Sequence, residues 1–259
     1  MRWAGSKRQL IPVLKNFWKP SYERYLEPFA GSACLFFALS PERAILGDLN
    51  ADLISTYREV KYRPRGILSR LSKLRRSKRL YTKLRSMDPT TLCASARASR
   101  FIYLNRYCFN GLYRTNLRGE FNVPYGAAGT GTLPSLHHLR DCSSKLRRTR
   151  LVSGDFEKVL KHATSGDFVY IDPPFAIRSR RVFNEYDPAT FSIDDIKRLR
   201  SWMERLSRNR IAFVVSYAES DEADVLRKGF DFQAVSVRRN IAGFAAHRAA
   251  SKEILISNV

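Results

Sequence analysis

The feature that most constrains the fold is an alternation of strand-like and helix-like segments that is interrupted once, in the middle of the chain. Apolar segments typical of short strands occupy residues 22–29 and 44–48, and residues 52–61 carry apolar side chains at helical spacing. After the interruption, a helical pattern occupies 193–206, and strand-like segments recur at 151–153, 168–171, 211–215, 232–237 and 253–257. Strands that alternate with helices predict an α/β fold around a largely parallel sheet.

The interruption, residues 62–146, has no strand signal and is strongly basic. Helical patterns such as 94–107 alternate there with a glycine-rich loop at 126–131. From Arg58 to Arg150 the chain holds 22 Lys and Arg against 4 Asp and Glu, which accounts for +18 of its net +22. Basic side chains laid against phosphates release condensed counterions, so this excess favours a nucleic acid as partner. A membrane surface would require a basic helix with a continuous apolar face or a lipidation site, and neither is clear.

The first motif with functional character, Glu27-Pro28-Phe29-Ala30-Gly31-Ser32-Ala33, directly follows the first expected strand. Ligands of a parallel sheet bind beyond the carboxyl ends of its strands, and a turn of small residues lets the backbone approach a cofactor. Asp48, 17 residues after Gly31 at the end of the next strand, can accept hydrogen bonds from ribose hydroxyls. The turn alone is equally compatible with a structural role and lacks the full G-x-G-x-x-G pattern. Together with Asp48 it indicates a nucleoside-containing cofactor.

The second motif, Asp172-Pro173-Pro174-Phe175, follows the apolar segment 168–171. Two prolines remove two backbone donors and stiffen the turn, so the Asp172 carboxylate and a nearby backbone carbonyl form a fixed pair of acceptors. Such a pair can hold the exocyclic amine of adenine by both N–H groups, which localises the nitrogen lone pair for attack on an electrophilic methyl group. Phe175 can stack on the base. In isolation, the motif is also compatible with a strand that ends in a proline turn.

Cysteine usage and hydropathy exclude several other classes of protein. Cys34, Cys93, Cys108 and Cys142 lie far apart without a C-x-x-C pair, so neither a disulfide framework nor a zinc site is expected. No segment approaches the roughly 18 consecutive apolar residues of a membrane span, and the N-terminal residues lack the apolar run of a secretory signal. We therefore expect a soluble, cytoplasmic protein without a metal ion.

With these motifs in this order, the sequence resembles the DNA adenine methylase (Dam) family, the N6-adenine DNA methyltransferases of the D12 (alpha) class. The resemblance extends from Trp3 to about Ile256. The matching runs are Trp3 to Lys7, Glu27 to Gly31, Gly47 to Asn50, Asp52 to Ser55, Tyr103 to Tyr107, Asn110 to Leu112, Asn116 to Gly126 and Asp172 to Phe175. It implies a Rossmann-like sheet of the S-adenosylmethionine-dependent methyltransferases with an inserted, mainly helical target-recognition domain. Residues 1–56 and 147–259 would form the catalytic domain and residues 57–146 the DNA-binding one.

The resemblance also implies a role for each motif at the reaction centre. S-adenosylmethionine would be the methyl donor, and its contacts would come from Trp3, Lys7, the turn Phe29, Ala30, Gly31 and Ser32, Asp48 at the ribose, Asp155 and Phe156 at the adenine ring, and Asp172. The catalytic residues would be Asp172, Pro173, Pro174 and Phe175, acting on a flipped adenine in double-stranded DNA. The protein would be encoded by a bacterium or a phage and associated with the nucleoid.

The family's DNA contacts map onto the basic interruption. Phe109, Asn110 and Leu112 would wedge between bases, Arg114 would read a guanine, and Arg2 and Pro124 would touch further base edges. The DNA-contacting set is completed by Arg106, Asn116, Arg118 and Asn122. Alternatives are core packing for Phe109 and Leu112, a phosphate contact for Arg114 and simple packing for Trp3.

Departures from the family pattern fall in four places. Ser32-Ala33 stands where relatives often have a second glycine, Phe109 replaces a frequent tyrosine, Ala127-Ala128 replaces bulkier residues, and Ile241 to Arg248 departs from the usual polar loop. The recognition site is therefore either GATC or another short sequence. Neither an orphan nor a restriction-modification role is favoured, and monomer and weak dimer remain equally open.

Other methyltransferases fit the motifs less well. An N4-cytosine enzyme more often carries Ser-Pro-Pro-Tyr, a C5-cytosine enzyme needs a Pro-Cys pair, and protein-glutamine methyltransferases use Asn-Pro-Pro-Tyr without such a basic insertion. A non-enzymatic DNA-binding protein with a vestigial methyltransferase core is the remaining alternative.

Overall fold

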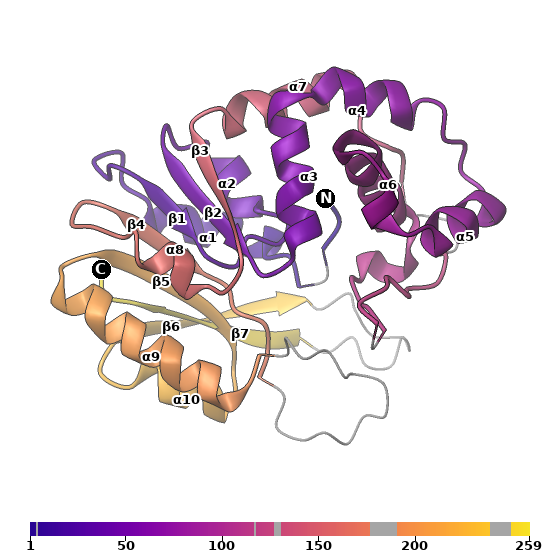
Figure 1. The fold of residues 1–259 in the computed structure, drawn as a ribbon. Helices are drawn as coiled ribbons and strands as arrows, with labels where there is room; N and C mark the ends of the chain where they lie inside the picture. The colour runs from indigo at the N-terminus through magenta and orange to yellow at the C-terminus, as the bar shows by residue number, and fades with distance from the viewer. Residues whose placement is uncertain (4, 117, 127–130, 177–190, 239–249) are drawn as a thin grey trace.

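The computed structural model describes residues 1–3, 5–116, 118–126, 131–176, 191–238 and 250–259. Seven strands form one sheet in the order β3-β2-β1-β4-β5-β7-β6 (Figure 1). The strands are β1 (Tyr25–Glu27), β2 (Ala44–Asp48), β3 (Thr149–Ser153), β4 (Phe168–Ile171), β5 (Ala212–Ala218), β6 (Asp231–Arg238) and β7 (Ala250–Ser257). The α/β fold expected from the sequence is confirmed.

Strands β1 to β5 run parallel to one another, whereas β7 runs antiparallel to both β5 and β6. The chain places β2 and β3 on one side of β1, then returns to place β4 on the other side. The strand order therefore reverses between β1 and β4. In open α/β sheets, ligands bind beyond the carboxyl ends of the strands at such a point.

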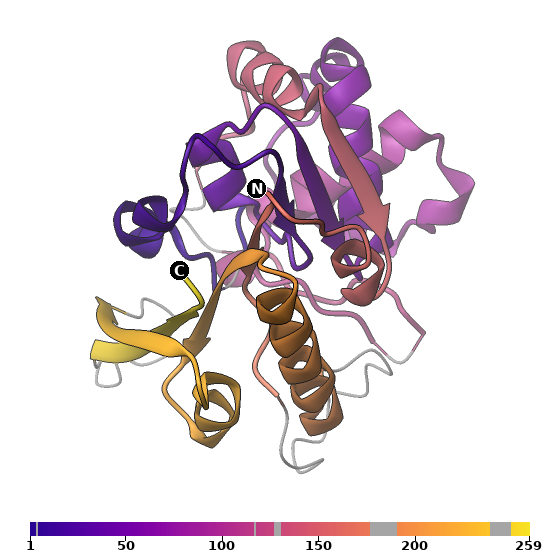
Figure 2. The ribbon, with the colours of Figure 1, turned by 90° about the vertical axis from the view of Figure 1, so that its left-hand side faces the viewer.

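Two buried clusters cover the two faces of the sheet, because side chains alternate along each strand. Phe168 and Tyr170 of β4 belong to one cluster, and Val169 and Ile171 to the other. The second cluster is closed by α8 (Glu157–Leu160), α9 (Ile193–Arg208) and α10 (Asp221–Arg227), of which α9 lies along the sheet (Figure 2). A capping box between Ser192 and Asp195 begins α9 and satisfies its first backbone donors.

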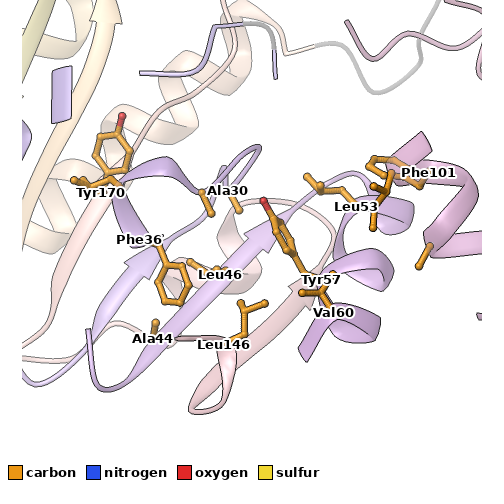
Figure 3. Packing of buried hydrophobic residues seen from close by; sticks show 14 of the residues in the cluster. Ala30, Phe36, Ala44, Leu46, Leu53, Tyr57, Val60, Phe101, Leu146 and Tyr170 are labelled. Atoms are coloured by element: carbon orange, nitrogen blue, oxygen red, sulfur yellow. The ribbon is translucent and has the colours of Figure 1, made fainter. Parts of the chain in front are cut away.

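The first cluster continues from the sheet into the helices between β2 and β3. These helices are α3 (Ala51–Tyr62), α4 (Pro64–Leu71), α5 (Lys78–Ser86), α6 (Ala94–Tyr107) and α7 (Leu136–Leu146), with η3 (Pro89–Thr91) and η4 (Phe109–Gly111). Figure 3 shows Tyr57 and Val60 of α3 packed toward Leu46 and Leu146, with Phe101 of α6 beside Leu53. Helix α3 runs across the expected boundary at residues 56 and 57, and its buried Leu53, Tyr57 and Val60 belong to the same cluster as Leu46 of the sheet.

The remaining elements lie at the N-terminus and after β1. They are η1 (Arg8–Leu10), α1 (Ile11–Leu14), η2 (Lys15–Phe17) and α2 (Cys34–Leu39). Strand β1 is shorter than the predicted 22–29 because Pro28 lacks a backbone donor and because Tyr22 lies in a turn closed on Lys19. Part of the predicted loop 126–131, Ala127-Ala128 and the segment from Ile241 to Arg248 lie outside the described residues.

Within the described ranges, no helix combines the length and apolar character that crossing a membrane requires.

Candidate active site

Four loops meet at the carboxyl edge of the parallel strands. They follow β3, β2, β1 and β4, which are neighbours in this order. Asp155 and Phe156 follow β3, and Asp48 is the last residue of β2. The turn 29–32 follows β1, and Asp172 to Phe175 follow β4. Neighbouring strands are about 4.8 Å apart, so the four loops span about 14 Å along the edge. The sequence-predicted cofactor and catalytic residues therefore come together in one row.

The turn after β1 is held by the Asp48 carboxylate. Gly31 N donates to Asp48 Oδ2 at 2.9 Å, and Asn50 N donates to Asp48 Oδ1 at 2.9 Å. On the other side, Tyr57 OH donates to the carbonyl of Gly31 at 2.7 Å. Burial raises the pKa of Asp48, and the two amide hydrogen bonds oppose this shift. Asp48 thus fixes the path of the small-residue turn.

Gly31 is required by both conformation and space. Its φ of +45° lies in the left-handed region, and a Cβ there would lie 2.9 Å from Cδ1 of Trp3. Trp3 therefore packs directly against the turn. Ser6 and Ser32 hydroxyls form a further hydrogen bond of 3.0 Å between the N-terminal segment and the turn.

Asp155 and Phe156 are held by α9. Asp155 Oδ1 accepts from an Arg198 guanidinium nitrogen at 2.9 Å and from Glu157 N at 2.9 Å. The Phe156 ring stacks on Phe29 with 5.3 Å between centroids, and the Arg198 guanidinium lies 4.8 Å from its centroid. The side chain of Phe156 is thus a packing element at the end of β3, and the Asp155 carboxylate is already paired.

Asp172 lies at the end of β4 with one of its two oxygens engaged. Oδ1 accepts from Ser216 Oγ at 3.0 Å and lies 3.4 Å from Lys7 Nζ. Ser216 in turn shares a 3.0 Å hydrogen bond with Tyr170 OH, in the buried layer beneath. Among the described residues, Oδ2 has no hydrogen-bond partner, and the Asp172 side chain is 22% exposed. The carboxylate is therefore oriented through Oδ1 and open at Oδ2.

Charged groups around Asp172 tune its ionisation. Burial raises the pKa of Asp172 to about 6, although the Lys7 ammonium and the Ser216 hydroxyl favour the ionised form. Burial disfavours the charged form of Lys7 and acts to lower its pKa. The nearby carboxylates of Asp172 and Glu253 act in the opposite direction, and their combined effect is larger, so the pKa of Lys7 is raised. Lys7 Nζ lies 3.0 Å from Glu253 Oε2. At neutral pH the site therefore holds an ionised Asp172 beside a protonated Lys7.

Phe175 presents an aromatic face next to this carboxylate. Its side chain is 49% exposed and its ring packs edge-on against Tyr217, with 5.6 Å between centroids. Ala176 N donates to Tyr217 OH at 2.9 Å, which anchors the chain after the two prolines. An exposed ring fixed in this way can stack on a planar ligand whose amine reaches Asp172.

Residues 107–126 form an irregular hairpin that gathers the expected DNA contacts. Backbone hydrogen bonds join Phe109 to Pro124, Asn122 to Arg114 and Asn116 to Glu120. Phe109 is 46% exposed, which argues against core packing, and Asn110 has a φ of +51°. Leu112 is half-buried. Arg114 Nε donates to Asn122 Oδ1 at 3.0 Å, and exposed Arg118 follows at the tip.

The N-terminal residues connect this hairpin to the reaction centre. Arg2 N donates to Asn105 Oδ1 at 2.9 Å, and Asn105 Nδ2 donates to the carbonyl of Arg2 at 2.6 Å. The Arg2 guanidinium also donates to the carbonyl of Arg106 at 3.2 Å. Trp3 stacks on Tyr113 at 5.9 Å. Arg2 thus contacts α6, Trp3 the hairpin and the turn after β1, and Lys7 the Asp172 carboxylate.

Sequence reasoning missed several residues around Asp172, namely Tyr170, Ser216, Tyr217 and Glu253, as well as Asn105 and Arg198. Ser216 carried a weak signal, because it is a polar residue within an otherwise apolar strand, whereas Glu253 directly follows Lys252 and carried none. Among the described residues, no group of three or more His, Cys, Asp or Glu side chains could hold a metal ion.

Comparisons with known proteins identify the family of the chain. The family model of the D12 class N6 adenine-specific DNA methyltransferases matches residues 3–241. A Type II methyltransferase of Lactococcus lactis subsp. cremoris is 34% identical, with 99% of this chain and 94% of the relative covered. A DNA adenine methylase of Salmonella typhi is 32% identical over 98% of this chain and 93% of its own length. A Type II methyltransferase of Methanocaldococcus jannaschii is 31% identical over 93% and 91%.

The resemblance seen in the sequence is therefore confirmed, and S-adenosylmethionine is the methyl donor of this class. The chain belongs to the D12 class of N6 adenine-specific DNA methyltransferases.

Proposed function

We propose that Asp172 holds the N6 amine of a flipped adenine through Oδ2 while the protein holds Oδ1. The observation that carries this proposal is the division between the two oxygens: Ser216 and Lys7 engage Oδ1, and Oδ2 has no partner among the described residues. An ionised carboxylate offers lone pairs but no donor, so it accepts an amine N–H without competing for it. Pro173 and Pro174 fix the backbone whose carbonyls supply the second acceptor, and Phe175 stacks on the base.

The residues along the carboxyl edge fit S-adenosylmethionine. The cofactor supplies an electrophilic methyl group. Trp3, Lys7 and the turn Phe29, Ala30, Gly31 and Ser32 would line its methionine part, where Gly31 leaves no room for a side chain beside Trp3. Asp48 would accept the ribose hydroxyls, since each of its oxygens keeps a second lone pair beside its backbone amide. The segment carrying Asp155 and Phe156, one strand beyond β2, would border the adenine ring.

Residues 57–146 would form the target-recognition domain and bind double-stranded DNA. Their support is the basic charge of this region and the hairpin, which presents Phe109 to solvent. Asn110 and Leu112 would enter the stack with Phe109, and Arg114 would read a base. The remaining contacts would come from Arg2, Arg106, Asn116, Arg118, Asn122 and Pro124. We propose GATC or another short sequence as the target, because relatives named DNA adenine methylase and Type II methyltransferase are both similar.

The site of action would be the nucleoid of a bacterial cell, as for an orphan methylase or the partner of a restriction enzyme. Sequencing that detects modified bases, applied to DNA from cells producing the protein, would reveal both the modified base and its context. N6-methyladenine at one short motif is expected, whereas N4-methylcytosine would contradict the proposal.

A matched pair of variants tests Asp172 directly. Asp172→Ala should abolish transfer of labelled methyl from S-adenosylmethionine to duplex DNA, a loss of at least about 100-fold. Binding of DNA in a gel-shift experiment should stay within about threefold of wild type, because the hairpin is untouched. Asp194→Ala, which removes an exposed carboxylate on α9, serves as control and should retain full activity. Transfer by Asp172→Ala within about tenfold of wild type would remove Asp172 from its role.

A further inference from the structure

Glu253 is a buried charged residue of β7, and none of the roles described so far uses it. It lies on β7 opposite Ala218 of β5 and is 4% exposed. Its Oε2 accepts from Lys7 Nζ at 3.0 Å, whereas the same ammonium lies 3.4 Å from Asp172 Oδ1. Two carboxylates thus share one lysine, and the closer contact is to Glu253 rather than to Asp172, the carboxylate proposed to hold the substrate amine.

We propose that Glu253 is a positioning residue for the reaction, which keeps the Lys7 ammonium from pairing fully with Asp172 and so preserves Asp172 as an acceptor for the adenine amine. This inference rests on the proposed role of Asp172. It assigns to β7, the antiparallel strand of the sheet, a task at the reaction centre.

The competition between the two carboxylates gives the physical reason. A carboxylate in a close ion pair has lone pairs directed at the ammonium and its charge partly neutralised, so it accepts other hydrogen bonds less strongly. With Glu253 ionised, Lys7 stays near enough to keep Asp172 charged in a buried site but is held toward β7. Without that second anion, Lys7 has only Asp172 as its anionic partner. Lys7 Nζ already lies 5.7 Å from the centroid of Phe175, so this movement would also crowd the face on which a base stacks.

The ionisable groups that face Asp172 come from every element around it. They are Lys7 from the N-terminal segment, Glu27 of β1, Cys34 of α2, Tyr170 of β4 and Glu253 of β7, with the Ser216 hydroxyl of β5 as hydrogen-bond donor. After burial, Lys7 and Ser216 favour the ionised form of Asp172, whereas the negative charge of Glu253 raises its pKa. Removing the charge of Glu253 therefore lowers the pKa of Asp172, and removing that of Lys7 raises it.

The pKa of Asp172 should thus shift in opposite directions in the Glu253 and Lys7 variants, a result that a merely structural role would not produce. The single-turnover rate of methyl transfer is measured from pH 5 to pH 9 for Glu253→Gln, Lys7→Gln and the double variant, with affinities for DNA and S-adenosylmethionine measured separately. Glu253→Gln should lower the rate at neutral pH about tenfold and leave the DNA affinity within about threefold of wild type. It should also move the acid limb of the pH–rate profile, where the rate falls as Asp172 is protonated, to lower pH by roughly half to one unit. Lys7→Gln should move the limb to higher pH, and the double variant, which removes one charge of each sign near Asp172, should lie between the two.

Glu219→Gln is the matched control, because the exposed Glu219 directly follows β5 and its carboxylate lies 3.9 Å from the Lys252 ammonium at the surface. It should show the wild-type rate and limb. A wild-type rate and limb for Glu253→Gln, or a limb moved to higher pH, would overturn the inference while leaving Asp172 in its role. If Glu253→Gln does not fold, the double variant decides, since a limb at or above that of Lys7→Gln contradicts the proposal. Loss of the Asp172 role itself would show separately, as transfer by Asp172→Ala.

Discussion

Asp48 and Asp172 lie at the same edge of the parallel sheet, and the two carboxylates differ in their hydrogen-bond partners. Asp48 ends β2 and accepts one backbone amide on each oxygen, from Gly31 and Asn50. Asp172 follows β4 and has one oxygen held by Ser216 and Lys7, with no described partner at the other. Burial raises the pKa of both groups, so burial alone does not separate them.

The difference lies in what holds each carboxylate. Backbone amides belong to the turn itself, so Asp48 stabilises the shape of the cofactor loop and becomes part of it. The side chains of Lys7 and Ser216 instead contact Asp172 at Oδ1, which leaves Oδ2 oriented and accessible. A symmetrically satisfied carboxylate suits a fixed binding surface, whereas a half-satisfied one suits a changing substrate.

The largest effects are expected when each of the two carboxylates is replaced by asparagine. Asp172→Asn should reduce the single-turnover rate about 100- to 1000-fold, because the amide replaces one of the two accepting oxygens with an NH2 donor. The dissociation constant of S-adenosylmethionine should stay within about threefold of wild type. Calorimetric titration and a rapid-quench assay measure the two quantities.

Asp48→Asn should show the opposite division. Its amide group would face a backbone N–H of Gly31 or Asn50, so the turn should distort and the affinity for S-adenosylmethionine should fall about 10- to 100-fold. At saturating cofactor most of the rate should return. Equal losses of rate and affinity in both variants would abolish the distinction between the two carboxylates.

A smaller effect is expected at the turn that Asp48 holds. Gly31→Ala should lower the free energy of unfolding by about 2 kcal/mol and weaken cofactor binding, because a Cβ would meet Trp3 in a left-handed conformation. Gly229→Ala is the control, since Gly229 has a φ of +75° but open space around its Cβ position. It should lose about 1 kcal/mol in urea denaturation and keep wild-type affinity. Identical affinities in both variants would show that the turn does not border the cofactor.

The smallest effect concerns the hydrogen bond that orients Asp172. Ser216→Ala removes a donor that favours the ionised carboxylate, so the pKa of Asp172 should rise above about 6. The acid limb of the pH–rate profile should therefore move to higher pH, and the rate at pH 7 should fall a few-fold. A limb that moves to lower pH would contradict the assigned contact.

Most of the fold could be predicted because its signals are local. Residues 52–61 were predicted as a helix, and α3 spans Ala51–Tyr62 with Asn50 accepting from Leu53 N as its cap. Asp48 and Asp172 could be assigned to one edge because both directly follow apolar strands. The antiparallel placement of β7 was not predicted, because alternation along the chain carries no information about which strand pairs with which.

The surroundings of Asp172 could not be predicted for the same reason. Ser216 and Glu253 reach the site through the pairing of β5 with β7 and through contacts with residues more than 40 positions away. From sequence, Lys7 was expected to contact the cofactor, and its ion pairs with Asp172 and Glu253 were not predicted. Family patterns indicate which residues matter, but only the packing shows which atoms remain open.

The most direct test of the central claim is a crystal structure of the wild-type protein with S-adenosylhomocysteine and a duplex that contains the target adenine. The account predicts that N6 of a flipped adenine lies about 3 Å from Asp172 Oδ2, with Ser216 still bonded to Oδ1 and the Phe175 ring stacked on the base. An adenine amine bound by other residues, or an Asp172 whose two oxygens are both occupied by protein groups in that complex, would contradict it.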